Sequence, residues 1–257
     1  MSLTISLRSE VLKTKRTAAF YFTLIGAAII PVMILFSIAT HGMMGDKRAK
    51  TDTINFFFNL SSEILSICIF PMFVVLVCTL LPQIEYRNGA WKQVLTSPQT
   101  KLNVFAAKFL NIQLLMLLFL VASHLFIWVV VIATHFILPE LHVLQQSFNG
   151  RQLLITYGHI YVSVLAICAL QFWIGLRSKN FLIPIAIGIA CWLVGTIMAA
   201  EYHSAASPYF LYSFHVIRLL DQFNVHLAQV EWRSFGYAVV ILLLAFLDFR
   251  KRKMAGK

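Results

Sequence analysis

A long run without charged residues is the feature that most constrains this chain. From Phe109 to Pro139 there is no Asp, Glu, Lys or Arg, and the run is longer than the ~20 apolar residues that a bilayer-spanning helix needs. Hydrophobic residues make up 60% of the 257 residues and charged residues only 12%, which leaves too few charges to cover a soluble globule. The sequence therefore predicts an all-α integral membrane protein.

Apolar runs of similar character recur along the chain and predict six transmembrane helices. The first run is too long for the core of a signal peptide, which has roughly 7–15 residues, so we treat it as a retained span. Pro31 and Pro71 predict kinks in the first two spans. The sixth run is short, and Trp232 and Phe249 must extend it. Within one transmembrane domain, residues 1–257, the predicted spans are 17–45, 64–84, 109–139, 152–176, 180–200 and 232–249.

Two segments outside the predicted spans are expected to lie along the membrane. In residues 1–16, Leu3, Leu7 and Val11 recur four apart among basic residues, which suits an amphipathic helix at the interface. Residues 201–231 form an external segment that is rich in apolar side chains. We interpret it as re-entrant or interfacial helices, because protein can shield an irregular backbone at membrane depth.

The basic residues are distributed unevenly between the two sides of this topology. If both termini are cytoplasmic, 15 of the 21 Lys and Arg residues lie inside and seven of the ten acids lie outside, in agreement with the positive-inside rule. We therefore expect a multi-pass protein of the cell inner (cytoplasmic) membrane with both termini in the cytoplasm. The net charge of +11 comes from short loops and forms no basic face, so we expect no nucleic-acid partner.

The longest polar interruption between two clear spans is the cytoplasmic loop 85–108. Asn88–Gly89 is a turn signal, and Ala90–Leu95 can form a short helix with Trp91 on its apolar face, ended by Pro98. The residues alone leave two interpretations open. The helix could lie among lipid headgroups as a connector, or it could dock into a groove of a cytoplasmic partner.

The same loop resembles a family signature. The pattern is E-x-x-x-G-x-W-K…L-T-x-P…K, and the residues that carry it are Glu85, Gly89, Trp91, Lys92, Leu95, Thr96, Pro98 and Lys108. It resembles type-two ATP-binding-cassette (ABC) exporter permeases, especially the bacitracin-resistance and lantibiotic-immunity branch. The N-terminal pattern Ser9-Glu10…Lys13…Lys15-Arg16-Thr17 is similar to that branch as well.

The resemblance implies that the loop is a coupling helix, which receives the push of a separate cytoplasmic ABC ATPase subunit. It also implies a second permease copy or a paralogue in the membrane lipid, as a homodimer or a heterodimer. Trp91 is expected to anchor the ATPase, because buried aromatic residues commonly dominate an interface. Glu85 is expected to orient the helix by pairing with Arg87, Lys92 or a basic group of the ATPase. The residues expected to couple the two subunits are Glu85, Arg87, Gly89, Trp91, Lys92, Leu95 and Pro98.

Motifs for catalysis or nucleotide binding are missing from the sequence. It has no G-x-x-x-x-G-K-[ST] phosphate loop, no H-E-x-x-H and no G-x-S-x-G. We therefore expect no enzyme activity and no cofactor in this chain, with ATP and Mg²⁺ bound by the partner ATPase. The four cysteines lie in apolar runs without C-x-x-C spacing, which predicts neither a disulfide framework nor a metal site.

A few ionisable residues near the outer side deserve separate treatment. Glu63 is a candidate for the substrate pathway, because it is an acid at the mouth of a span, where ionisable groups are costly to hold. The alternative is a carboxylate that reaches headgroup water. None of the eight histidines has a close i, i+4 partner, so we interpret them as polar residues rather than as metal ligands. His124 and His159 are expected within spans.

Together these features predict the permease subunit of an ATP-driven exporter. We expect an amphipathic or lipid-like cargo, for example a membrane-active peptide antibiotic, because the spans offer apolar surfaces and few charges. The alternative is a secondary transporter or a non-transporting membrane scaffold, neither of which needs an ATPase. The scarcity of acids in mid-membrane argues against a proton-coupled carrier.

Overall fold

Helices make up all the regular structure in the part of the chain that can be described. The computed structural model describes residues 3–42, 51–87, 89, 91, 99–200, 206–217 and 227–251. Six of its helical segments are long and apolar enough to cross a membrane. The protein is therefore an all-α, multi-span membrane protein, and this prediction from the sequence is confirmed.

The six spanning segments differ in continuity. Four are single helices: α2 (Ala18–His41), α7 (Lys101–Ile137), α10 (Leu182–Ala200) and α12 (Leu227–Lys251). The second span joins α4 (Thr53–Ile64), the π-helix η1 (Leu65–Ile69) and α5 (Phe70–Arg87), and the fourth joins α8 (Gly150–Ser163) and α9 (Leu165–Arg177). The shorter elements are α1 (Leu3–Thr14), η2 (Pro139–Leu141), η3 (Val143–Gln145), η4 (Ser207–Tyr209) and α11 (Phe214–Ile217).

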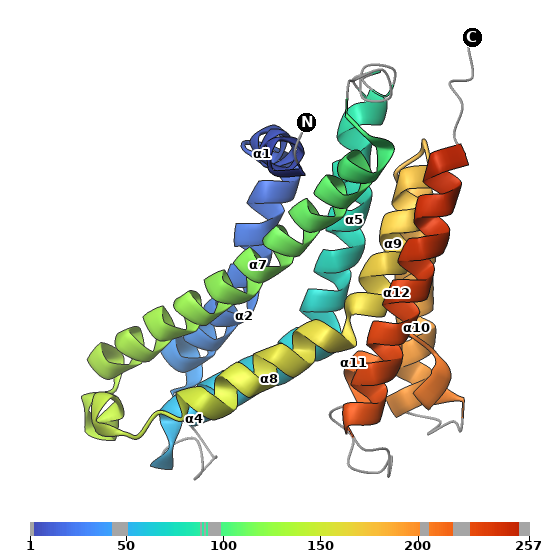
Figure 1. The fold of residues 1–257 in the computed structure, drawn as a ribbon. Coiled ribbons are helices and arrows are strands. Elements are labelled where there is room, and N and C mark those ends of the chain that lie inside the picture. The colour runs from blue at the N-terminus through green and yellow to red at the C-terminus, as the bar shows by residue number, and fades with distance from the viewer. Residues whose placement is uncertain are drawn as a thin grey trace.

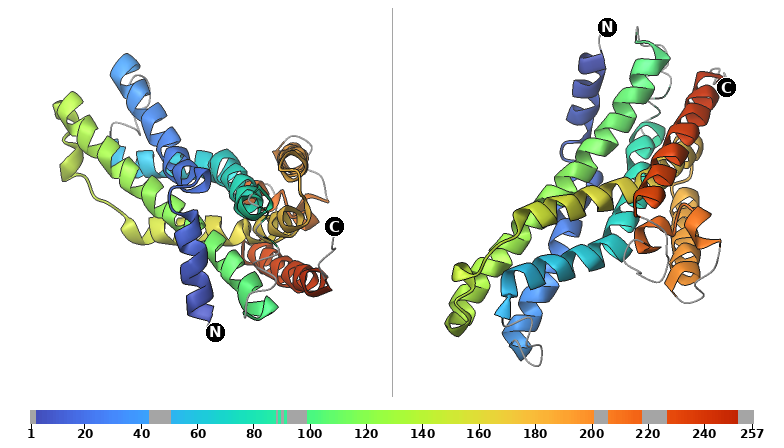
Figure 2. Two further views of the ribbon diagram at one scale, coloured as in Figure 1. Left: turned by 90° about the horizontal axis from the view of Figure 1, so that it is seen from above. Right: turned by 60° about the horizontal axis from the view of Figure 1, so that its bottom comes forward.

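Two groups of helices meet around α5 (Figures 1 and 2). In one group α2 packs along the long α7, and α1 lies across the end of both that is uppermost in Figure 1. In the other group α12 packs on α9, and α10 lies beside them. Helices α4 and α8 slant from the centre toward the opposite end of α7. The end that holds α1 and the last turn of α12 is called the upper end below.

Close packing holds these groups together, because lipid tails are as apolar as the side chains and provide little hydrophobic driving force between helices. The rings of Phe73 on α5 and Phe119 on α7 stack with their centroids 4.2 Å apart. On the other side of α5, a Cβ atom built on Gly175 of α9 would come 2.3 Å from the carbonyl oxygen of Cys78. Only a glycine lets α5 and α9 approach this closely.

The second span changes direction at η1, where Figure 1 shows α4 slanting and α5 upright. Pro71 has no N–H, so it cannot bond to the carbonyl of Ile67 four residues earlier. The indole Nε1–H of Trp192 on α10 donates to that carbonyl instead, at 2.9 Å. The helix begins at Thr53, well before the predicted start at residue 64, because the segment before Glu63 is amphipathic and buries Phe57 and Phe58.

The fourth span is broken at Val164, which no proline or glycine marks. The backbone leaves helical geometry there (φ −98°, ψ −5°). Ser234 of α12 bonds to both sides of the break: its hydroxyl donates to the carbonyl of Val162 at 2.7 Å and accepts from the N–H of Ala166 at 3.3 Å. A side chain of another span thus satisfies backbone groups that the break leaves without helical partners.

In the described part of the segment before the sixth span, residues 206–217, Tyr209 is exposed, but residues 212–217 pack inside the protein. Tyr212, Phe214 and His215 are buried, and a Cβ atom on Gly195 of α10 would come 2.4 Å from the carbonyl oxygen of Tyr212. The ring of His215 is fully buried, and this burial lowers its pKa to about 3. This part of the segment is therefore enclosed by protein.

Candidate functional site

Four charged side chains from three helices meet at the upper end. Lys108, in the second turn of α7, contacts Glu85 at the end of α5, and its Nζ lies 3.1 Å from Glu10 Oε2 on α1. Lys13 Nζ, also on α1, lies 2.8 Å from Glu10 Oε1 and 3.3 Å from Glu85 Oε1. These four residues are called the ion cluster below. It joins the two ends of the loop 85–108 to each other and to α1.

The ion cluster is largely withdrawn from solvent, which makes it costly to break. Glu85 and Lys108 are buried, and removal of one partner from a buried ion pair typically costs about 3–5 kcal/mol. Burial would raise the pKa of Glu10, but Lys108 and Lys13 outweigh it and hold that pKa below its ordinary value. Burial would lower the pKa of Lys13, but Glu10 and Glu85 raise it above its ordinary value. All the charges in the cluster therefore have opposite charges beside them.

Trp91 of the loop turns its ring toward the protein's own helices. The ring centroid lies 5.2 Å from that of Tyr86 on α5 and 6.3 Å from that of Phe249 on α12. The ammonium group of Lys108 lies 5.4 Å from the same ring, within reach of a cation–π interaction. The side chain is half-buried, and its Nε1–H is buried without a hydrogen bond to a described residue. Trp91 thus attaches the loop to α5, α7 and α12.

The end of α5 shows why the loop leaves the helix where it does. Gly89 has φ +61°, a left-handed conformation that glycine adopts without strain and that commonly ends helices. Its N–H bonds to the carbonyl of Tyr86 at 3.3 Å. Arg87 is exposed and, together with Thr17 and Gln83, lines a cleft of about 370 Å³ between α2 and α5. This cleft opens beside the start of the loop.

The remaining predicted coupling residues cannot be placed. Lys92, Leu95 and Pro98 lie outside the described residues, as does most of the predicted helix Ala90–Leu95. Of the predicted partners of Glu85 within the chain, Arg87 makes no ion pair with a described residue. Glu85 pairs with Lys108 and Lys13 instead, because its side chain is buried whereas that of Arg87 points to the outside.

Further hydrogen bonds extend from the ion cluster to the second group of helices. The hydroxyl of Tyr86 donates to the carbonyl of Leu176 at the end of α9, at 2.6 Å. On the same helix the indole of Trp173 donates to Asp248 of α12 at 3.2 Å. The upper ends of α5, α9 and α12 are therefore linked as well as those of α1, α5 and α7.

The sequence of this helical protein matches a known family. The family model of the ABC-2 family transporter proteins matches residues 6–195, which includes most of α1, the ion cluster and the loop. The chain belongs to the ABC-2 family. This ABC-2 protein is therefore a multi-pass membrane subunit of an ABC transporter, and the family implies an ABC ATPase as its partner. No curated protein matches the chain.

Glu10 and Lys13 complete the charged site of this ABC-2 permease, although the sequence analysis did not include them among its coupling residues. Both residues belong to the N-terminal pattern that resembles the family, and this pattern was the sequence signal that could have identified them. Their contact with Glu85 could not be read from the chain, because the first span and nearly all of the second lie between them. Lys108 stood in the loop pattern, but its position 23 residues after Glu85 gave no indication of a direct pair.

The outer-side candidates do not join this site. Glu63 is exposed near the end of α4 and makes no ion pair with a described residue. His159 of α8 pairs with Glu231 of α12, and His124 lies on α7 beside α8. Among the described residues, His, Cys, Asp and Glu nowhere form a group of three or more that could hold a metal ion.

Proposed function

We propose that this ABC-2 permease is the membrane subunit of an ATP-driven exporter and that its ATPase acts on the loop 85–108. The observation that carries the proposal is the ion cluster. Glu85 and Lys108 stand at the two ends of the loop and pair with each other and with α1. A displacement of the loop must therefore move α1, α5 and α7 together or break buried ion pairs, which is costly.

The contacts of Trp91 and Tyr86 would transmit a displacement of the loop to the second group of helices, α9, α10 and α12. The ring of Trp91 contacts that of Phe249 on α12, and the hydroxyl of Tyr86 donates a hydrogen bond to the end of α9. A force on the loop would then displace both groups of helices, which lie on either side of α5. We propose that this relative movement opens and closes a path for the cargo, as in alternating access.

The rest of the proposed assembly follows from the charge distribution and the family. Both termini and the loop lie in the cytoplasm, and the protein resides in the inner membrane. Two permease subunits, identical or paralogous, work with ATPase subunits that bind ATP and Mg²⁺. The cargo is amphipathic or lipid-like, for example a peptide antibiotic of the kind handled by the bacitracin-resistance and lantibiotic-immunity branch.

The first experiment replaces the aromatic anchor of the loop. Trp91→Ala should release the ATPase from the purified membrane complex, because the loop loses the aromatic ring that holds it in position against α5 and α12. Trp232→Ala, an exposed tryptophan of α12, is the matched control. Pull-down of the ATPase measures the effect. Undiminished retention and export in Trp91→Ala would contradict the proposal, as would export that persists in cells without the ATPase.

A second variant separates binding from coupling. Glu85→Gln keeps the shape of the side chain but removes the charge that pairs with Lys108, so the ATPase should stay bound while ATP hydrolysis no longer drives export. Glu140→Gln changes an exposed acid far from the cluster and should leave export unchanged. ATPase and export assays on the same vesicles test this. Normal coupling in Glu85→Gln would remove the cluster from the proposed mechanism.

Glu63 keeps its proposed part in the cargo pathway. It is exposed on α4, close to the change of direction at η1. Glu63→Gln should lower the export rate while the ATPase remains bound and the protein remains folded. Full export in this variant would leave Glu63 as a carboxylate that only reaches headgroup water.

A further inference from the structure

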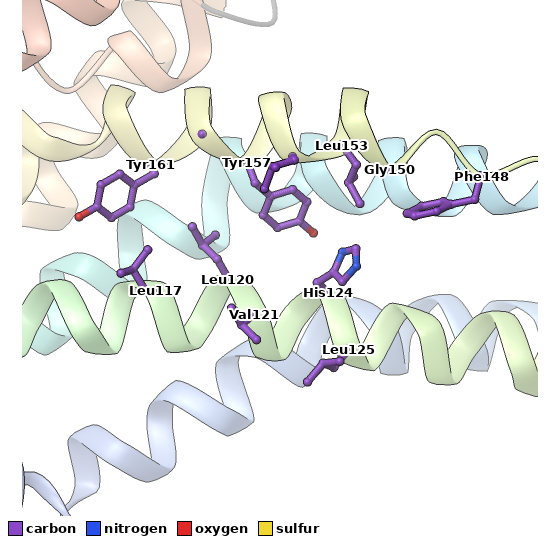
Figure 3. A pocket seen from close by; sticks show the side chains of 12 residues that line it. Leu117, Leu120, Val121, His124, Leu125, Phe148, Gly150, Leu153, Tyr157 and Tyr161 are labelled. Atoms are coloured by element: carbon purple, nitrogen blue, oxygen red, sulfur yellow. The ribbon is translucent and has the colours of Figure 1, made fainter.

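A groove runs between α7 and α8, away from the ion cluster (Figure 3). Its volume is about 520 Å³, and its lining is almost entirely apolar. Leu117, Val121 and Leu125 line it from α7, and Leu153 and Leu154 line it from α8. Phe148, in the segment before α8, closes one end and packs its ring 4.9 Å from that of Trp128.

The groove faces the membrane. Val121, Leu125 and Leu154 on its walls are exposed on the surface of two spanning segments. Water is scarce in the hydrocarbon region, so an apolar groove there is filled by lipid chains, by an apolar ligand or by protein. Acyl chains surround the exposed faces of spanning helices, which favours an acyl chain as the occupant of this groove.

One polar group in the groove lacks a partner. The side chain of Tyr157 is more than nine-tenths buried, at 8% exposure, and its hydroxyl makes no hydrogen bond with a described residue. Figure 3 shows its ring pointing from α8 toward α7. A buried hydroxyl without a hydrogen-bond partner is unfavourable, and a ligand with a hydrogen-bonding atom would satisfy it.

A second donor faces the same space. The Nε2 atom of His124 accepts a hydrogen bond from the indole N–H of Trp128, at 3.1 Å. The neutral ring therefore carries its proton on Nδ1, and no described residue accepts from that atom. The rings of His124 and Tyr157 are perpendicular, with their centroids 6.0 Å apart. The nearby Tyr161 hydroxyl already donates to Gln113, at 2.6 Å.

We propose that the groove between α7 and α8 binds the acyl chain of an ester- or amide-linked lipid amphiphile. Its carbonyl oxygen has two lone pairs, and it accepts hydrogen bonds from Nδ1 of His124 and from Tyr157, whose buried hydroxyl reaches the groove after a turn of its ring. A neutral carbonyl fits this place better than an ionised headgroup, because a charge at membrane depth is costly. The inference rests on the proposed function in one respect, since it assigns the lipid-like cargo named there to a particular site.

A photoreactive lipid tests the site directly. The probe is a monoacylglycerol whose acyl chain carries a diazirine and a terminal alkyne, added to membrane vesicles that contain the full chain and its partners, without ATP. After illumination, mass spectrometry should locate the label in the parts of α7 and α8 that line the groove. Unlabelled monoacylglycerol should compete with the probe. Labelling confined to other helices would overturn the proposal.

Two glycines provide a matched pair of variants. A Cβ atom added to Gly158 on the groove, or to Gly236 on the outside of α12, meets no atom within 4 Å, so neither substitution creates a clash at its first atom. Gly158→Leu should fill the groove and lower labelling of α7 and α8 at least about fivefold. Gly236→Leu should label like the wild type. Equal labelling in both variants would exclude the groove.

The hydroxyl is tested separately. Tyr157→Phe should weaken probe binding about 3- to 10-fold, which corresponds to one hydrogen bond, while the thermal stability of the protein should not fall, because the hydroxyl has no described partner there. Tyr21→Phe, an exposed tyrosine of α2, is the control. An alkane probe without a carbonyl should be insensitive to Tyr157→Phe. If Tyr157→Phe labels as the wild type does, the carbonyl contact is wrong.

These measurements also separate the inference from the proposed exporter. Labelling needs no ATP, so it reports on the groove even if Trp91→Ala retains its ATPase and the coupling proposal fails. Conversely, intact coupling with an unlabelled groove would refute the site alone. Cross-linking of a cysteine placed at Leu154 to a second copy of the chain would show that protein fills the groove and would also refute the proposal.

Discussion

The ion cluster and the groove between α7 and α8 use buried polar groups in opposite ways. At the ion cluster, Glu85 and Lys108 each meet opposite charges on other helices, so the polar groups hold helices together. In the groove, the Tyr157 hydroxyl is buried without a partner, so it adds nothing to the cohesion of the protein. Ion pairs between helices make those helices move as a unit, whereas a buried hydroxyl without a partner beside an apolar groove marks a place where a ligand can bind.

The largest expected effect on stability comes from a substitution in the ion cluster, and it tests this comparison directly. Lys108→Met leaves Glu85 and Glu10 with Lys13 as their one shared partner in the cluster and removes the buried cation, and we expect the free energy of unfolding to fall by about 3–5 kcal/mol. Tyr157→Phe in the groove should not lower it and should raise it by up to about 1–3 kcal/mol, because the variant removes a buried hydroxyl that has no partner among the described residues. Denaturant unfolding in detergent, followed by circular dichroism, compares the two variants. Similar losses in both would mean that the groove hydroxyl is structural.

A smaller effect is expected at the break in the fourth span, where the polar group is satisfied but uncharged. Ser234→Ala removes the bonds to Val162 and Ala166, and we expect a loss of about 1–2 kcal/mol. Ser37→Ala, an exposed serine of α2, should cost almost nothing. The same unfolding measurement applies. A loss as small as that of the control would show that the break does not depend on α12.

The smallest effect concerns pH at the edge of the ion cluster. Because the folded pKa of Glu10 lies below its model-peptide value of 4.5, its ion pairs stabilise the folded protein above about pH 4.5, and this contribution is lost as the pH falls through the folded pKa. Wild type should therefore be more stable than Glu10→Gln at pH 7, and the gap should close in acid. Melting curves at several pH values test this. A gap that widens in acid would give the opposite sign and contradict the assignment.

The sequence was sufficient for the architecture but not for the contacts between segments. Charge-free runs predicted six spans because their signal is local, and Pro71 marked the change of direction in the second span. The break at Val164 carried no such mark, since its stabilising partner, Ser234, lies in another span. The pairing of Glu85 was predicted from nearby charges, whereas the structure places Lys108 and Lys13 beside it. The groove was not predicted, because it exists only where α7 and α8 lie side by side.

The π-helix η1 also sets the rotational phase of the second span. Buried positions before it fall at Phe57 and Phe58, then Ser61 and Ser62, then Leu65 and Ser66, and the next pair comes five residues later, at Phe70 and Pro71. An uninterrupted α-helix advances 100° per residue, so without the extra residue of η1 the inner face of α5 would be turned by about that angle away from α9. Deletion of a single residue in Leu65–Ile69 would therefore act like a rotation of one half of the span against the other. The number of residues in η1 therefore determines how the buried face of α5 is oriented relative to that of α4.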